Sequence, residues 1–273
     1  MFSKNIKLIL IILLFYQSPL HSKSTSFENF NSKNLSKYFS GIVAFENKNN
    51  PGALDFFNSS KILLNQHDPF LKRYISSLVL EKKVPQAINV IKKNIGKNNS
   101  NFFDAYLLMI IDNLKKNNLD LAYSNLSSAY NFTEQDRFNY AILETLKQYI
   151  YVFKEKKIIS KKKNFGNLTN ISETFQRCYL EDPEADNYFI NLINNKEADY
   201  TRYTYFYLGY LIENNRISDA KKIIDDLEFI NTTLLLSQGK SWIENGNPEK
   251  LADFFSCKNH NDIISEFLFL ISN

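Results

Sequence analysis

Glycine and proline are scarce in this 273-residue sequence, which holds seven and six copies of them. Because these residues interrupt regular structure most strongly, their scarcity argues against a loop-rich sheet protein. The sequence also has no stretch with the apolar–polar alternation of a half-buried strand. Large apolar residues are abundant instead, with 16 Tyr and 23 Phe. The composition therefore predicts an all-α fold, in a chain long enough to bury a large core.

The short motifs that mark common catalytic sites are missing too: a Gly-rich phosphate loop, a G-x-S-x-G elbow and an H-E-x-x-H zinc motif. Beyond the N-terminal segment the histidines are His67 and His260, far apart in the chain. Cys257 and His260 form one C-x-x-H, which falls short of the four ligands of a structural zinc site. We expect no catalytic residues, no metal and no cofactor. An enzyme domain in the less regular middle of the chain is the minor alternative.

A strong charge imbalance is also lacking, because the formal net charge is only +4. Without Lys4 and Lys7, which belong to the N-terminal segment, 31 positive and 29 negative residues leave +2. We therefore expect no nucleic-acid partner. The one basic run, residues 154–163, carries six lysines and one glutamate. It is either a patch for an acidic partner or an anionic lipid head group, or a solvated loop.

The N-terminus has the pattern of a secretory signal peptide over residues 1–22. Lys4 and Lys7 precede an apolar run, Leu8–Tyr16, that is too short to span a bilayer. An uncleaved anchor or a buried first helix are the alternatives. No later run reaches 18 apolar residues, so we expect no integral membrane span in the mature chain. This interpretation makes the protein exported, periplasmic in a Gram-negative source and otherwise secreted. Residues 23–34 are polar and predict a flexible lead-in.

A small residue followed four places later by a large apolar one recurs along the chain and puts both on one helical face. The pairs are Ala53 with Phe57, Ala87 with Ile91, Ala122 with Leu126, Ala220 with Ile224, and Leu251 with Phe255. Successive spacings are 34, 35, 98 and 31 residues, and 98 is close to three periods of about 34. Gly41, twelve residues before Ala53, lies where a missing side chain lets two helices approach closely.

A helix–turn–helix unit repeated near 34 residues resembles the tetratricopeptide repeat (TPR). The resemblance implies a right-handed α–α superhelical solenoid over residues 35–273. The expected repeats are about 35–68, 69–103, 104–136, 137–169 and 170–199 (both degenerate), 200–232, 233–260, and an incomplete 262–273. The sequence departs from the family pattern in two respects. Ile75, Ile110 and Leu208 replace the glycine of the first helix, and the proline that ends each unit is missing.

Prolines and Asp-Pro pairs predict several helix starts. Pro51 and Pro85 suit the first turn of a helix. Asp68-Pro69 predicts a start with Asp68 as N-cap, and Asp182-Pro183 starts another pair of helices. The expected first helix is Leu35–Lys48. The tyrosine-rich helix 199–215 is either core or a recognition surface.

The resemblance also implies a function without catalysis: a protein-interaction scaffold that binds a peptide or a helix in a concave groove. The first helices of successive pairs line this groove in the family. If these positions pack against one another, the groove is closed. The corresponding residues here are Tyr38, Ile42, Phe45, Lys72, Val79, Leu107, Ile111, Leu114, Tyr205, Ile212, Leu236, Lys240 and Ile243.

The two cysteines, Cys178 and Cys257, are 79 residues apart, more than two repeats. Each repeat of a solenoid adds roughly 10 Å. The cysteines should then lie beyond the about 7 Å that a disulfide can span. We expect both to be reduced.

The last helix, 262–272, is very apolar, and no helix follows it in the sequence to cover its open side. It predicts either a homo-oligomer or a truncated longer array. The alternative function is accordingly a structural subunit of an envelope complex that assembles through this helix.

Overall fold

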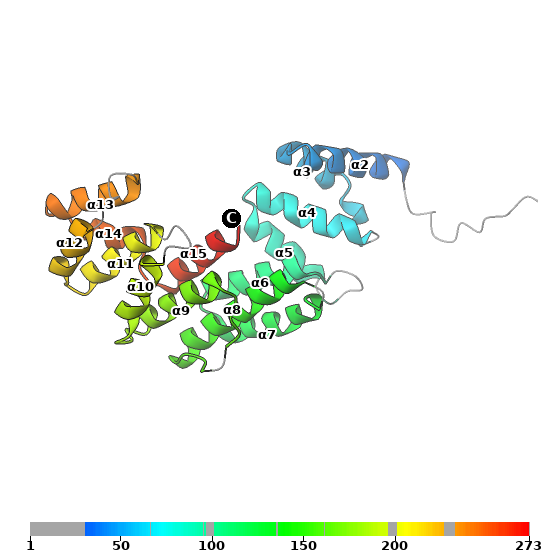
Figure 1. The fold of residues 1–273 in the computed structure, drawn as a ribbon. Coiled ribbons are helices and arrows are strands. Elements are labelled where there is room, and N and C mark those ends of the chain that lie inside the picture. Colours follow the sequence, from blue (N-terminus) through cyan, green and yellow to red (C-terminus); the bar gives the residue numbers. More distant parts are fainter. Residues whose placement is uncertain are drawn as a thin grey trace, which may run out of the picture. The chain divides into compact units, whose positions relative to one another are not determined.

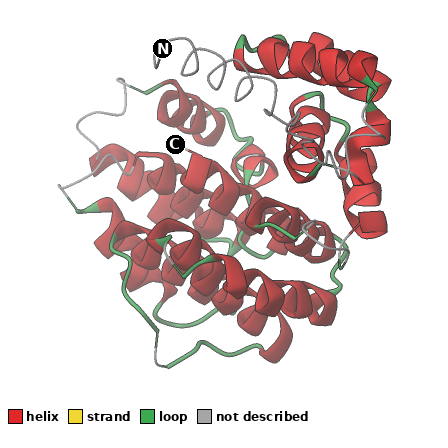
Figure 2. Ribbon diagram, turned by 90° about the vertical axis from the view of Figure 1, so that its right-hand side faces the viewer, coloured by secondary structure: helices red, strands yellow, loops and turns green. Residues whose placement is uncertain are grey.

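A computed structural model describes residues 31–65, 67–94, 96, 101–134, 136–160, 162–195, 201–226 and 233–272. Every regular element in these ranges is a helix, and no strand occurs among them (Figure 2). The all-α prediction is therefore confirmed. The predicted signal peptide lies outside the described residues. The chain divides into two compact units, residues 1–87 and 88–273.

Unit 1 contains α2 (Ser32–Glu46), α3 (Asn50–Ser59), the short 3₁₀ helix η2 (Lys61–Asn65), α4 (Asp68–Leu80) and the start of α5 (Val84–Asn94) (Figure 1). The first helix begins three residues earlier than predicted, because the Asn31 side chain accepts a hydrogen bond from the Lys33 N–H at 2.9 Å and caps it. Pro51 and Pro85 lie in first turns, as predicted. The N-cap of α4 is His67, one residue before the predicted Asp68.

Gly41 allows α2 and α3 to pack closely. A Cβ atom at this position would lie 2.7 Å from the ring of Phe57, which is closer than real Cβ contacts come. The rings of Tyr38, Phe57 and Phe70 pack around this contact in tilted and edge-to-face arrangements, with centroids 5.6–6.1 Å apart. The close approach predicted at Gly41 is confirmed.

Unit 2 contains most of the helices. In chain order they are α6 (Phe103–Lys115), α7 (Leu119–Ala129), the 3₁₀ helix η3 (Tyr130–Phe132), α8 (Arg137–Glu155), α9 (Asn167–Tyr179), α10 (Ala185–Ile193), α11 (Thr201–Glu213), α12 (Ile217–Asp226), α13 (Leu234–Glu244), α14 (Lys250–Phe254) and α15 (His260–Ser272). Consecutive helices pair as hairpins, among them α6 with α7, α9 with α10, and α11 with α12. No helix in the described ranges is both long and apolar enough to cross a membrane.

The predicted small–large pairs form the core of the hairpins. All ten residues of the five pairs are buried. The tyrosine-rich helix is also core, because Tyr203, Tyr205 and Tyr207 of α11 are buried. Beside them, Gly209 lets α14 approach: a Cβ atom there would lie 3.3 Å from the Leu251 carbonyl oxygen.

One backbone conformation recurs in the turns of six hairpins, although sequence analysis did not find it. A residue with left-handed φ between 52° and 74° ends the first helix of each hairpin: Lys48, Lys82, Asn117, Glu181, Asn215 and Gly246. The next N–H bonds to a carbonyl five residues back, as Asn49 does to Ala44 at 2.9 Å and Asp182 to Arg177 at 3.0 Å. This is the Schellman arrangement, which satisfies free carbonyls at a helix end. Between successive hairpins that both contain such a left-handed residue, these residues are 34, 35, 34 and 31 positions apart. These distances are close to those between the buried small–large pairs.

The last helix does not continue the series of neighbouring hairpins. α15 contacts α6 and α9, which precede it by many residues, and lies alongside α9 (Figure 1). Its apolar residues Ile263, Ile264 and Phe267 are buried in the core of unit 2. The expectation that nothing covers this helix is therefore wrong, because the chain folds back and earlier helices cover it.

Candidate functional site

A cleft with a volume of about 520 Å³ and many polar lining residues lies between α9 and α10 in unit 2. The two helices form one hairpin whose apolar faces meet at Phe175 and Phe189, with ring centroids 6.4 Å apart. Glu181 takes the left-handed turn conformation, and the Asp182 carboxylate accepts a hydrogen bond from the Glu184 N–H at 2.8 Å. The core and the turn together fix the width of the cleft.

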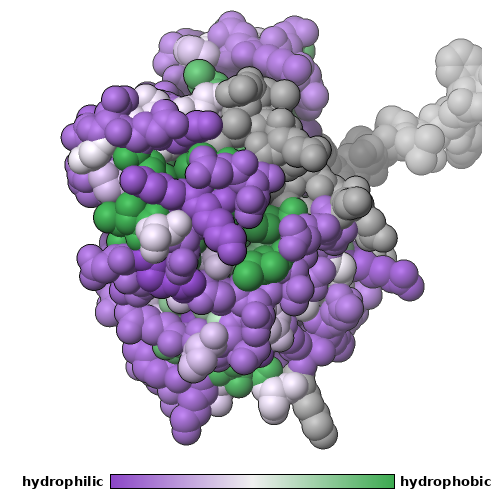
Figure 3. Space-filling view, turned by 60° about the vertical axis from the view of Figure 1, so that its left-hand side comes forward, coloured by the Kyte–Doolittle hydropathy of each residue, from purple (hydrophilic) through white to green (hydrophobic). Residues whose placement is uncertain are grey.

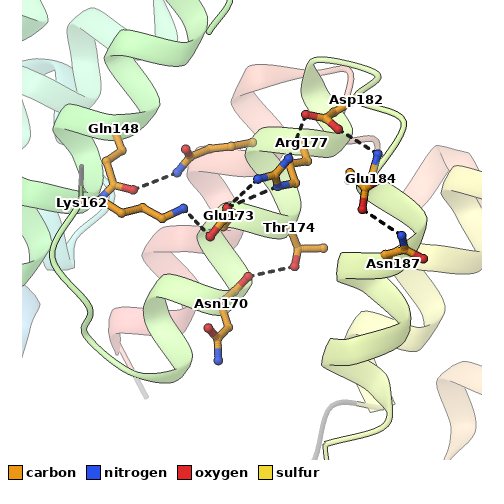
Figure 4. A network of polar contacts seen from close by, with 10 residues as sticks. Gln148, Lys162, Asn170, Glu173, Thr174, Arg177, Asp182, Glu184 and Asn187 are labelled. Atoms are coloured by element: carbon orange, nitrogen blue, oxygen red, sulfur yellow. Dashed lines mark hydrogen bonds and ion pairs between the residues drawn. The ribbon is translucent and has the colours of Figure 1, made fainter. Parts of the chain in front are cut away.

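Side chains with amide and hydroxyl groups line both walls. Four of them are asparagines, and the residues around the cleft are Asn170, Thr174, Glu184, Asn187, Tyr188, Ile190, Asn191, Leu192 and Asn195. Figure 4 shows Asn170 and Thr174 on α9 beside Glu184 and Asn187 at the start of α10. The Asn187 amide donates to Glu184 at 2.9 Å, and the Thr174 hydroxyl donates to the Asn170 carbonyl at 2.8 Å. The side chains of Asn170 and Asn191 make no hydrogen bond within the described residues.

An ion network holds the α9 wall in place (Figure 4). Glu173, whose side chain is 13% exposed, pairs with Lys162 and with Arg177, whose Nη2 is 3.0 Å away. Arg177 also bonds Asp182 at 3.0 Å. Its guanidinium lies 4.1 Å from the centre of the Tyr188 ring, a cation–π contact that joins α9 to α10.

The network sets the ionisation states beside the cleft. Burial raises the pKa of Glu173, but hydrogen bonds from Lys162 and Arg177 outweigh it, so that the pKa lies below its usual value. Burial raises the pKa of Tyr188, and the Glu173 carboxylate raises it further. At neutral pH the carboxylate is therefore charged and the phenol is protonated.

The two histidines of the described ranges belong to different units. His67 is in unit 1, 3.2 Å from the Tyr38 hydroxyl, and His260 is in unit 2 with its ring against Phe153. No group of three or more His, Cys, Asp and Glu side chains that could hold a metal ion occurs among the described residues. What the cleft offers chemically is hydrogen bonding by neutral amides, which both donate and accept.

The predicted groove residues differ in burial within each unit. In unit 1 Tyr38 is buried, Ile42, Phe45 and Val79 are half-buried, and Lys72 is exposed. In unit 2 Leu107, Ile111 and Lys240 are half-buried, whereas the remaining five are buried. Those five are Leu114, Tyr205, Ile212, Leu236 and Ile243. Six of the thirteen are therefore part of the core.

The asparagines of the cleft were missed because the sequence is rich in asparagine throughout, so that a single copy carries no signal. The spacing of three of these asparagines, however, does carry a signal. Asn187, Asn191 and Asn195 are four residues apart, which places them along one side of a helix and its extension.

The basic run is tied to the body of unit 2. Lys156 donates to the Tyr179 hydroxyl at 2.6 Å, Lys163 to the Tyr140 hydroxyl, and Lys162 pairs with Glu173. Only Lys154, of α8, reaches a well-exposed partner, Asp120, at 2.6 Å. Most of the described residues in this run are exposed, as the solvated-loop interpretation predicts, and lysine contacts attach the run to unit 2.

The prediction that the cysteines are reduced is wrong. Cys178 of α9 and Cys257, just before α15, form a disulfide with their Cα atoms 5.8 Å apart. The prediction assumed that only neighbouring hairpins touch, whereas the return of the chain to α9 brings these residues together. Since Cys257 is bonded to Cys178, it is not a metal ligand of the C-x-x-H sequence.

Comparison with known proteins finds no family model that matches this chain, and neither a curated protein nor a solved structure is significantly similar to it.

Proposed function

We propose that this chain is a non-catalytic binding scaffold of TPR-like hairpins, which holds an extended peptide in the cleft between α9 and α10. The hairpin turns, which share one conformation at spacings of 31–35 residues, support a degenerate TPR array. The observation that carries the function is the pair of asparagines, Asn170 and Asn191, whose amides line the cleft without a partner in the described residues.

An extended main chain fits these amides best. Its N–H and C=O groups alternate in direction and need both donors and acceptors, and an asparagine side chain offers both. A bound helix satisfies its own main-chain groups and would leave the amides unused. We therefore favour an extended segment over a helix as the partner in this cleft.

The place of action that we propose is outside the cytoplasm, periplasmic in a Gram-negative source and otherwise secreted. The leader-like residues 1–22 suggested export, and the Cys178–Cys257 disulfide adds an independent argument. Disulfides persist in oxidising compartments and are rare where thiols are kept reduced.

The alternative of an assembly subunit loses its main argument. It depended on an uncovered C-terminal helix, whereas α15 is covered by α6 and α9. On the face shown in Figure 3, hydrophobic residues form separate patches in a largely hydrophilic surface.

The test is a selection of phage-displayed random dodecapeptides on the folded chain. The selected peptides are then measured against Asn170→Ala/Asn191→Ala and against Asn131→Ala, an exposed asparagine outside the cleft. Each lost hydrogen bond costs about 1 kcal/mol, so the double variant should bind about 10-fold or more weakly. Asn131→Ala should bind as the unchanged chain does.

Peptides with N-methylated main-chain amides test the mode of binding. They lose N–H donors while keeping every side chain, so they should bind the unchanged chain more weakly than the parent peptides. Selected peptides that bind the double variant equally well, or that tolerate N-methylation at every position, would contradict the proposal.

A further inference from the structure

The α9–α10 cleft carries one negative charge that the protein does not balance. Among the residues that line the cleft, Glu184 is the one with a formal charge at neutral pH. Its side chain is exposed, and its carboxylate accepts a hydrogen bond from the Asn187 amide at 2.9 Å. An amide has no net charge, and no cationic side chain in the described ranges pairs with Glu184. The charge of this carboxylate is therefore available to a ligand.

The other carboxylates at this end of the hairpin already have cationic partners. The pairs are Glu173 with Lys162 and Arg177, Asp182 with Arg177 at 3.0 Å, Glu181 with Lys258 at 2.8 Å, and Asp186 with Arg216 at 2.6 Å. A cation that approached one of these carboxylates would compete with a cation of the protein. At Glu184 a ligand cation has no such competitor among the described residues.

Glu184 and the cleft asparagines of α10 lie along one side of the helix. Asn187 follows Glu184 by three positions and Asn191 follows Asn187 by four, which is the spacing of a single helical face. From Glu184 to Asn191 the helix axis rises by about 10 Å. An extended chain advances about 3.3 Å per residue, so the same distance corresponds to about three residues of a peptide that lies along α10.

We infer that the α9–α10 cleft selects segments with a lysine or arginine about three residues from the position whose main chain Asn191 holds, and that Glu184 recognises this basic residue. The inference rests on the proposed function, because it takes the occupant to be an extended peptide. A carboxylate at the rim attracts a cationic group and repels an anionic one, so it determines specificity more than affinity. Arginine can donate two hydrogen bonds to one carboxylate, and we therefore expect it to be preferred over lysine.

Glu184 also occupies the N-cap position of α10, where the helix dipole favours a negative charge. Glu249 occupies the same position in α14, and its side chain is exposed too. Neither glutamate caps its helix with a side-chain hydrogen bond. Glu249 does not line the cleft. Substitutions at Glu249 therefore reproduce the effect on a helix end without the effect on the cleft, and they are the matched control.

The test compares selections of phage-displayed random dodecapeptides on three chains. The unchanged chain and Glu249→Lys should both select peptides in which lysine and arginine are enriched at one position. Glu184→Lys should select peptides with aspartate or glutamate at that position, a gain of binding that an unfolded variant would not show. Glu184→Gln, which keeps the size of the side chain, should select peptides without a preferred charge. The same residue frequencies on all these chains would overturn the inference.

Fluorescence anisotropy of a labelled peptide selected on the unchanged chain measures the effect of the charge. Replacing its basic residue with norleucine should weaken binding to the unchanged chain about 5-fold at low salt, as expected for an exposed ion pair. The loss should be smaller at high salt, because the charges are screened. With Glu184→Gln the two peptides should bind equally. An equal loss with both chains would assign the preference to another group and overturn the role of Glu184.

Failure of this inference and failure of the proposed function give different results. Selected peptides that bind Asn170→Ala/Asn191→Ala as tightly as the unchanged chain would contradict the proposed function, and this inference would fall with it. Peptides that depend on the two asparagines but show no preferred charge would overturn this inference alone.

Discussion

Glu173 is the residue whose charge matters most beside the α9–α10 cleft. It is largely buried, paired with Lys162 and Arg177, and its pKa lies below the usual value. A carboxyl with a lowered folded-state pKa adds stability above its unfolded pKa, about 4.3. That stability is lost as the pH falls through the lower folded-state pKa.

Glu173→Gln should therefore reduce the free energy of unfolding by about 1–2 kcal/mol at pH 7, where the hydrogen bonds to a charged group are lost. The difference from the unchanged chain should shrink as the pH falls below about 4.3. Urea unfolding at a series of pH values, followed by circular dichroism, measures it. The exposed Glu249→Gln is the control. A difference that is constant from pH 7 to pH 3 would contradict the assigned ion network.

Hairpin turns are the elements whose backbone conformation is least evident from their residue types. Six turns share a left-handed residue, yet only the one at Gly246 has the glycine that suits it. Other residues in this conformation cost about 1–2 kcal/mol each. The identity of the turn residue varies from Lys to Asn to Glu, so no residue type marks the turn in the sequence.

Lys82→Gly, in the turn after α4, should raise the stability of unit 1 by about 1 kcal/mol, since glycine adopts φ of 58° without strain. Lys83→Gly, one residue later and outside the left-handed region, is the matched control and should destabilise it. Urea unfolding followed by circular dichroism compares the two. If both variants changed stability in the same direction, the left-handed turn at Lys82 would be in doubt.

The hairpins themselves could be predicted from the sequence because their signals are local. A small and a large residue four places apart, such as Ala53 with Phe57, must face the same neighbour, and Pro51 and Pro85 fix helix starts. The candidate cleft could be predicted much less well, since Asn170 and Asn191 belong to different helices. Their approach depends on the width of a hairpin, which a helical period does not encode.

At the scale of the whole molecule, contacts between helices far apart in the sequence determine features of the fold that the sequence pattern did not predict. α15 packs on α6 and α9, and Glu266 of α15 accepts three hydrogen bonds from Arg202 of α11, the shortest 2.7 Å long. Both interactions join segments that would be far apart if each hairpin contacted only its neighbours in the sequence. The apolar pattern of α15 showed that it needs a cover but could not show which helices provide it.

The Cys178–Cys257 disulfide closes a covalent loop that spans 79 residues in sequence. By restricting the unfolded chain, a bridge over such a loop stabilises the folded state by about 4 kcal/mol. Cys178→Ser/Cys257→Ser should lower the free energy of unfolding of unit 2 by that order, followed through the fluorescence of Trp242, the single tryptophan. Reduction of the unchanged chain should have the same effect, whereas the double variant should not respond to reductant. Non-reducing mass spectrometry should find the unchanged chain lighter by about 2 Da than its reduced form. An unreduced chain with two reactive thiols would restore the expectation of separate cysteines and remove the covalent link between α9 and the segment that precedes α15.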